Sequence, residues 1–163
     1  MVRGICVGWL CATVLVGGGP AVAPAESGRD LDTVERRLIA EINAYRARHG
    51  LPGLRPAQSL LRAADEHSRA MVADGFFGHS APGGESWSER LREHVPSGEI
   101  GEVLGELPPR AEHPAARLVR MWARSNQHRA VLLAPDLERI GVARRTGEID
   151  GRRRTVFTTD LSG

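Results

Sequence analysis

Cysteine is almost absent from this chain, and its absence excludes several classes of structure and chemistry. The only two cysteines, Cys6 and Cys11, lie close to the N-terminus of a 163-residue sequence. If that segment is removed as a leader, the remaining chain has no disulfide, no thiolate nucleophile and no cysteine ligand for a metal. We therefore expect packing alone to stabilise the fold.

Lysine is missing altogether, and neither sign of charge is in large excess. The chain has 22 basic and 20 acidic residues, and every basic residue is an arginine. This near-neutral balance argues against a nucleic-acid-binding protein, because such proteins need clustered positive charge. With 41% hydrophobic and 26% charged residues, a chain of this length suits one compact domain with its own core.

The chain also lacks an apolar run that would span a membrane comfortably, for which about 20 residues are needed. The run over residues 5–16 is shorter, follows Arg3, and leads to an Ala-Pro-Ala cleavage site at residues 23–25. These features predict a signal peptide over residues 1–25, and hence a secreted, extracellular protein with no integral membrane segment after cleavage. A leader that is retained is the alternative.

The first half of the remaining chain has helical patterns. Apolar residues at helical spacing predict a helix over residues 34–50, with Asp32 or Thr33 as its N-cap. A second helix is predicted over residues 57–75, and each of these segments closes on a glycine. The intervening residues, 51–56, are interpreted as a connector.

Two further helix starts have recognisable caps. Ser86 and Glu89 form a capping-box pattern that opens a short helix ending near residue 94. Pro114 stands at the first turn of another helix, which is predicted to bury Trp122. Ser125 is then expected to cap one more helical turn.

The tail changes to strand patterns. Two strand-like runs flank the dipeptide Asp150-Gly151, a strong hairpin signal, and residues 102–104 are expected to be extended. There are no internal repeats. Helices followed by strands predict, by pattern alone, an α+β or layered domain built on an antiparallel sheet.

One small group of residues has the chemistry of a site. His79 and His128 each stand beside a helix end or turn, and Glu102 lies between glycines at 101 and 105. Two imidazoles and a carboxylate can bind zinc and leave a position for water, and they can equally serve as an acid–base pair with an orienting group. No short ligand motif such as H-E-x-x-H supports either choice. His67, inside the second helix, is expected to be structural, and the others are expected at helix ends: His49, His94 and His113.

The order of these pieces resembles the bacterial branch of the CAP superfamily, which contains cysteine-rich secretory proteins, antigen 5 and plant pathogenesis-related proteins. The resemblance covers about residues 34–161. It rests on "INAYRARHGLPGLRPAQSLLRAADEHSRAMVADGFFGHSAPGG", "GEVLGE", "MWARSNQHRAVLLAPDLERIGVA" and "TVFTTDL". It implies a three-layer α-β-α sandwich around a central antiparallel sheet. The CAP (SCP-like) domain would then fill residues 34–163, after a short linker over residues 26–33.

The resemblance also implies a cleft. The family's cleft residues fall on His79, Glu102 and His128, the trio already selected above, and the cleft of eukaryotic members can hold zinc or another divalent ion. The resemblance thus implies Zn²⁺ as the cofactor, with these three residues as its ligands and none assigned a catalytic role, and a cleft that holds no metal in the cell is the alternative. Ser125 stands at the position of a second family glutamate.

Other residues depart from the family pattern or have an expected structural role. Val103 and Val131 replace family asparagines, which places the geometry of the cleft in question. Phe76 and Phe77 are expected to plug the core beneath His79.

These observations favour an extracellular binding or interaction module with a cleft lined by His and Glu. A metal-dependent, peptidase-like hydrolase and a lipid or sterol carrier are the alternatives. The expected partner is an extracellular protein, a cell-wall polymer or a lipid, and not a nucleic acid. The three arginines at residues 152–154 are expected to be a solvated strand end, with contact to anionic cell-wall polymers as the alternative.

Overall fold

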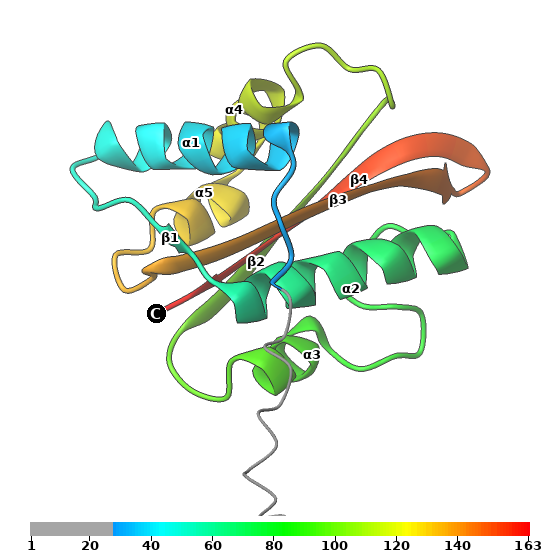
Figure 1. Cartoon of the computed structure of the whole chain (residues 1–163), viewed down its shortest axis with the longest axis horizontal. Helices are drawn as coiled ribbons and strands as arrows, with labels where there is room; N and C mark the ends of the chain where they lie inside the picture. Colours follow the sequence, from blue (N-terminus) through cyan, green and yellow to red (C-terminus); the bar gives the residue numbers. More distant parts are fainter. Residues whose placement is uncertain (1–27) are drawn as a thin grey trace, which may run out of the picture.

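The structure is a computed structural model that describes residues 28–163, so the predicted signal peptide lies outside the described residues. The described part contains helices on both sides of a central sheet, with α1, α4 and α5 on one side and α2 and α3 on the other (Figure 1). In chain order the elements are α1 (Thr33–Ala47), β1 (Arg55–Pro56), α2 (Gln58–Asp74), α3 (Trp87–His94), β2 (Ile100–Leu107), α4 (Pro114–Arg124), α5 (Asn126–Leu132), β3 (Arg139–Ile149) and β4 (Arg152–Ser162).

The strand order in the sheet is β1-β3-β4-β2. The long strands β3 and β4 form an antiparallel hairpin, and β2 pairs antiparallel with β4 over its whole length. The prediction of an α+β, three-layer α-β-α fold is therefore confirmed. The sheet is antiparallel except at β1, a two-residue strand in the predicted connector that pairs parallel with β3.

The capping and turn residues predicted from the sequence lie where a helix begins and where the β3–β4 hairpin turns. The Asp32 carboxylate accepts hydrogen bonds from the backbone N–H groups of Val34 and Glu35, and the Glu35 side chain completes the capping box of α1. Asp150 and Gly151 both have positive φ angles, of 47° and 71°, as the tight turn between β3 and β4 requires.

Residues just before α1 are tied to both helical layers. The Arg29 guanidinium pairs with Glu35 of α1 at 2.5 Å and with Asp65 of α2 at 3.3 Å. It also donates to the backbone carbonyl of Val142 in β3, at 3.1 Å. The part of the predicted linker that the structure describes is therefore packed against the domain.

Apolar side chains fill both faces of the sheet. The larger core lies between the sheet and the layer of α1, α4 and α5, and it contains the predicted Trp122. A smaller core lies beneath α2. The N-terminal part of α2 packs so closely on β3 that a Cβ atom at Gly141 would lie 2.1 Å from the backbone carbon of Leu60. Gly141 thus permits the contact between this helix and the sheet.

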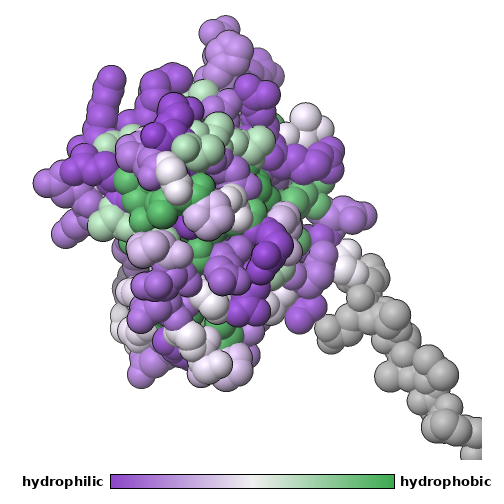
Figure 2. Space-filling model, turned by 90° about the vertical axis from the view of Figure 1, so that its left-hand side faces the viewer, coloured by the Kyte–Doolittle hydropathy of each residue, from purple (hydrophilic) through white to green (hydrophobic). Residues whose placement is uncertain are grey.

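The surface is mainly polar. At the end of the molecule shown in Figure 2, apolar side chains gather in a band at mid-height, and polar side chains surround them. Within residues 28–163 no helix combines the length and the apolar character that a membrane crossing would need.

Candidate functional site

The end of α2 sets the position of His79. Gly75 takes the left-handed conformation, with a φ angle of 69°, and ends the helix. Phe76 then turns into the smaller core, as expected, but Phe77 does not. Phe77 is 38% exposed, so the expectation that both phenylalanines plug the core is wrong for Phe77.

His67 holds the loop that carries His79. Its Nε2 donates a hydrogen bond of 2.9 Å to the backbone carbonyl of Gly78. Burial, together with the positive charge of Arg90, lowers the pKa of His67, so the ring stays neutral in its structural role. The expectation that His67 is structural is confirmed, and its bond acts on the residue next to His79.

The His79 ring is oriented by a buried carboxylate. His79 Nδ1 donates to Glu102 Oε1 at 2.7 Å, and the Arg90 guanidinium binds the other oxygen of Glu102. Burial alone would raise the pKa of Glu102, but the His79 hydrogen bond and the Arg90 charge lower it below its ordinary value. Since Nδ1 is engaged by Glu102, Nε2 is the ring nitrogen that no described residue hydrogen-bonds.

A second carboxyl group lies behind this pair. Asp160 of β4 is directly opposite Glu102 of β2 in the strand register, and it is completely buried. Burial and the negative charge of Glu102 raise the pKa of Asp160 well above its ordinary value, although Arg90 opposes this shift. Asp160 Oδ2 lies 3.9 Å from Arg90 Nη1, and no described residue donates a hydrogen bond of normal geometry to either Asp160 oxygen. Arg90 is thus the cation shared by two buried carboxyl groups.

A cavity of about 370 Å³ opens beside His79, between the two helical layers. His128 of α5 lines the same cavity, and burial and the proximity of His79 lower its pKa. Its lining residues come from the loop after α2, from β2 and from the α4–α5 corner: Phe77, Gly78, His79, Leu104, Gly105, Glu106, Met121, Trp122, Ser125 and His128. We call this cavity the histidine cleft.

The three predicted ligands are thus not equivalent. His79 and His128 line the histidine cleft, whereas Glu102 is 5% exposed and both of its oxygens are engaged by His79 and Arg90. Nowhere in residues 28–163 do three or more His, Asp or Glu side chains form a group that could hold a metal ion. Zinc binding remains a prediction, and the arrangement fits Glu102 as the group that orients His79 better than as a ligand.

The structure also places the residues that depart from the family pattern. Val103 is fully buried in the larger core, on the sheet face opposite Glu102. Val131 packs against Gly101, where a Cβ atom would lie 2.8 Å from Val131 Cγ1. Ser125 is at the predicted N-cap position of α5, but its hydroxyl makes no capping hydrogen bond and lines the cleft instead.

Two site residues, Arg90 and Asp160, were not selected from the sequence. Asp160 had a signal, because it is an acidic residue inside the strand-like run "TVFTTDL". A buried strand carries a charged group only where a partner compensates it. Arg90 had no such signal, since it resembles any solvent-facing arginine on a short polar helix.

Comparison with known proteins identifies the family of the chain. The model of the CAP family, described as the cysteine-rich secretory protein family, matches residues 39–160. The chain belongs to the CAP family. The CAP chain is 30% identical, over 125 residues, to the uncharacterized membrane protein YlbC of Bacillus subtilis (strain 168), and 26% identical, over 108 residues, to the uncharacterized protein YkwD of the same organism. These matches cover 76% and 66% of this chain but only 35% and 41% of the relatives, so the CAP chain spans well under half of either protein.

Solved structures support the CAP fold. An outer surface protein of Borrelia burgdorferi matches with a TM-score of 0.64 and 22% identity, over 83% of this chain and 99% of that one. An extracellular protein of Bacillus anthracis that contains an SCP domain matches with a TM-score of 0.61 and 24% identity, over 79% of this chain and 40% of that one. At these identities the likeness shows the fold alone.

Proposed function

We propose that this CAP protein is an exported binding module that holds its ligand in the histidine cleft. The observation that carries the proposal is the chain of contacts from Arg90 through Glu102 to His79. Buried charges are retained where they hold a group in one geometry, and here they orient an imidazole at the wall of a cavity. Extracellular proteins among the structural relatives are consistent with export.

The cleft combines an apolar floor with a few polar groups, which is the usual composition of a ligand site. Leu104 and Trp122 form part of the floor, while the two imidazoles and the Ser125 hydroxyl supply the polar contacts. A divalent ion bound here would be held by His79 Nε2 and His128, with Glu102 behind His79. Such an ion would serve as an additional anchor for an anionic or carbonyl-bearing ligand.

Zinc is a direct probe of the two imidazoles. We expect calorimetry to show zinc binding to the protein that is lost in both His79→Ala and His128→Ala. His113→Ala is the matched control, because His113 is an exposed histidine outside the histidine cleft. Absence of binding, or binding that survives both cleft substitutions, would remove the metal from the proposal.

The hydrolase alternative has less support. Ser125 lines the histidine cleft, but within residues 28–163 its hydroxyl is not hydrogen-bonded to either imidazole, as an activated nucleophile would be. Release of dye from labelled casein tests this alternative. Turnover by the parent protein that disappears in His79→Ala would replace the binding module with a peptidase.

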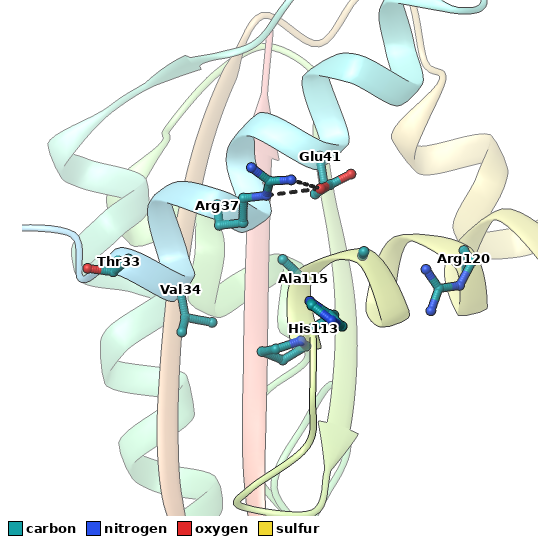
Figure 3. Close-up of a pocket in the computed structure, with 9 residues that line it drawn as sticks. Thr33, Val34, Arg37, Glu41, His113, Ala115 and Arg120 are labelled. Atoms are coloured by element: carbon teal, nitrogen blue, oxygen red, sulfur yellow. Dashed lines mark hydrogen bonds and ion pairs between the residues drawn. The ribbon is translucent and has the colours of Figure 1, made fainter.

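A second candidate function, lipid carriage, is favoured by a different cavity. A hollow of about 580 Å³ lies between α1 and α4, with apolar lining from Val34, Pro114, Ala115 and Ala116. Figure 3 shows Val34, Ala115 and His113 around it, with the Arg37–Glu41 ion pair along α1. An apolar hollow next to arginines suits an amphiphile with an anionic head group.

The two candidate functions are separable by displacement of a fluorescent fatty acid. A carrier should lose binding when Ala116→Trp fills the α1–α4 hollow, and should keep it when His79→Ala alters the histidine cleft. The reverse pattern would assign the probe to the histidine cleft. No binding of the probe to the parent protein would count against lipid carriage.

A further inference from the structure

The histidine cleft lies along an edge of the sheet, and within residues 28–163 no further strand pairs with that edge. β2 pairs with β4 on one side only, and Leu104, Gly105 and Glu106 of β2 line the cleft on the other. α4 packs closely over this edge, and it can do so because Gly105 has no side chain. A Cβ atom there would be 2.3 Å from Leu118 Cδ2. The cleft is therefore bounded by the strand edge and by residues from both helical layers.

One contact shows which backbone groups of β2 point into the cleft. The indole N–H of Trp122 donates to the Leu104 carbonyl at 2.7 Å, so this carbonyl points away from β4. In an antiparallel ladder, the N–H and C=O of one residue point the same way, and the direction alternates from residue to residue. The Leu104 N–H and both backbone groups of Glu106 therefore also face outward, and no described residue is hydrogen-bonded to them.

Exposed apolar side chains gather at the same place. Among the described residues only Phe77 and Met121 are exposed large hydrophobic residues, at 38% and 46%, and both line the histidine cleft. Phe77 comes from the loop after α2 and Met121 from α4, so they flank the strand edge from opposite layers. Methionine is flexible and polarisable, and it accommodates partner side chains of different shapes.

We propose that the ligand of the histidine cleft is an extended peptide segment that pairs with the outward backbone groups of Leu104 and Glu106 that no described residue occupies. Unpaired N–H and C=O groups at a strand edge are complementary to another strand, and alternate side chains of that strand would meet Phe77 and Met121. His79, held by Glu102, is positioned to hydrogen-bond the segment through its free nitrogen. This inference rests on the proposed function, because it names the ligand class of the same cleft.

The methyl groups of the methionines provide NMR probes with which this inference can be tested. The chain has three: Met1 in the predicted leader, Met71 in the smaller core and Met121 in the cleft. With ¹³C-methyl methionine, the Met121 resonance reports occupancy of the cleft and the Met71 resonance reports the integrity of the core. The probes are pools of acetylated, amidated hexapeptides with alternating apolar and polar positions, added to the full chain.

Backbone pairing is then tested apart from side-chain contacts. We expect the pools to shift the Met121 resonance and to leave that of Met71 in place. The same pools with alternate amides N-methylated should bind about tenfold more weakly, because they lose backbone hydrogen bonds while keeping their side chains. Glu106→Pro removes one outward N–H and should weaken binding similarly.

Three other results would overturn the inference. If no pool shifts Met121, the ligand is not a peptide, and the zinc titration and the fatty-acid displacement still test independently whether the histidine cleft binds a ligand. If N-methylated pools bind equally well, the cleft binds ligand but not by strand addition. A dimer seen by sedimentation that Glu106→Pro disperses would assign the edge to a second copy of the chain. If the Met71 resonance shows that Glu106→Pro is unfolded, the N-methylated pools alone decide.

Discussion

Replacing Arg90 with methionine tests the electrostatic centre of the site. Arg90 is 15% exposed in its side chain and is the cation that both Glu102 and Asp160 face. Methionine keeps much of the apolar stem and removes the charge. The Arg90→Met protein retains two neighbouring carboxyl groups in a buried position without a compensating cation.

The magnitude of the loss follows from the geometry. Two unit charges about 4 Å apart attract by about 4 kcal/mol at an effective dielectric constant near 20, and Arg90 lies closer than that to the charged Glu102. Desolvation of the guanidinium offsets part of this attraction. Breaking a buried ion pair by removing one partner usually costs about 3–5 kcal/mol, and we expect a loss in free energy of unfolding of this size at pH 7.

The pH dependence of the loss has a definite sign. Arg90 contributes to the lowered pKa of Glu102 and opposes the raised pKa of Asp160, so its removal raises both. The folded Arg90→Met protein then binds more protons than its unfolded chain and gains stability as the pH falls from 7 towards 5. The difference between variant and parent should therefore shrink at the lower pH.

Urea unfolding followed by circular dichroism at both pH values measures this difference. Arg92→Met is the matched control on the same helix, since within residues 28–163 the Arg92 side chain donates only to the Val95 carbonyl. A loss below about 1 kcal/mol for Arg90→Met at pH 7 would refute its role as a shared cation. So would a loss that stays the same at pH 5, or one that Arg92→Met reproduces.

Three further predictions concern the framework of the site. Gly141→Ala should lower the free energy of unfolding in urea by about 3 kcal/mol or more, because the new Cβ would overlap the backbone of Leu60 and cannot rotate away. A change near zero would contradict this close contact. Arg46 is fully buried and donates to four backbone carbonyls. Arg46→Met should therefore lower the free energy of unfolding by about 3 kcal/mol in the same assay. A variant as stable as the parent would show that these bonds contribute little. The lowered pKa of His67 predicts that stability is lost as the pH falls below its usual value of 6.5. His67→Gln, which can still donate to Gly78, should flatten that part of a pH–stability profile, and an unchanged slope would assign the effect to another group.

The parts of the fold that the sequence predicted well depend on neighbouring residues. Asp32 with Glu35, Ser86 with Glu89, and Asp150 with Gly151 act within a few positions, so their roles follow from local backbone chemistry. Helix faces were predictable for the same reason. The three-layer arrangement was predicted through the resemblance to CAP proteins, not through these local signals.

The parts that the sequence did not predict depend on distant contacts. β1 is a strand only because β3 passes beside it, and its two residues carry no strand pattern of their own. Phe77 was assigned to the core because it is a phenylalanine, although the chain direction after Gly75 leaves it exposed. The ligand role predicted for Glu102 took no account of Arg90, which approaches it from another helix.

The position of β4 in the sheet has a consequence for how the chain assembles. β4 is the last described element in sequence, yet it pairs with both β2 and β3 and so is, with β3, one of the two inner strands. A chain that emerges from the ribosome N-terminus first cannot complete this sheet until residues 152–162 are available. Contacts between residues far apart in sequence also form slowly. The earlier strands and helices consequently stay without this inner strand until β4 has been synthesised.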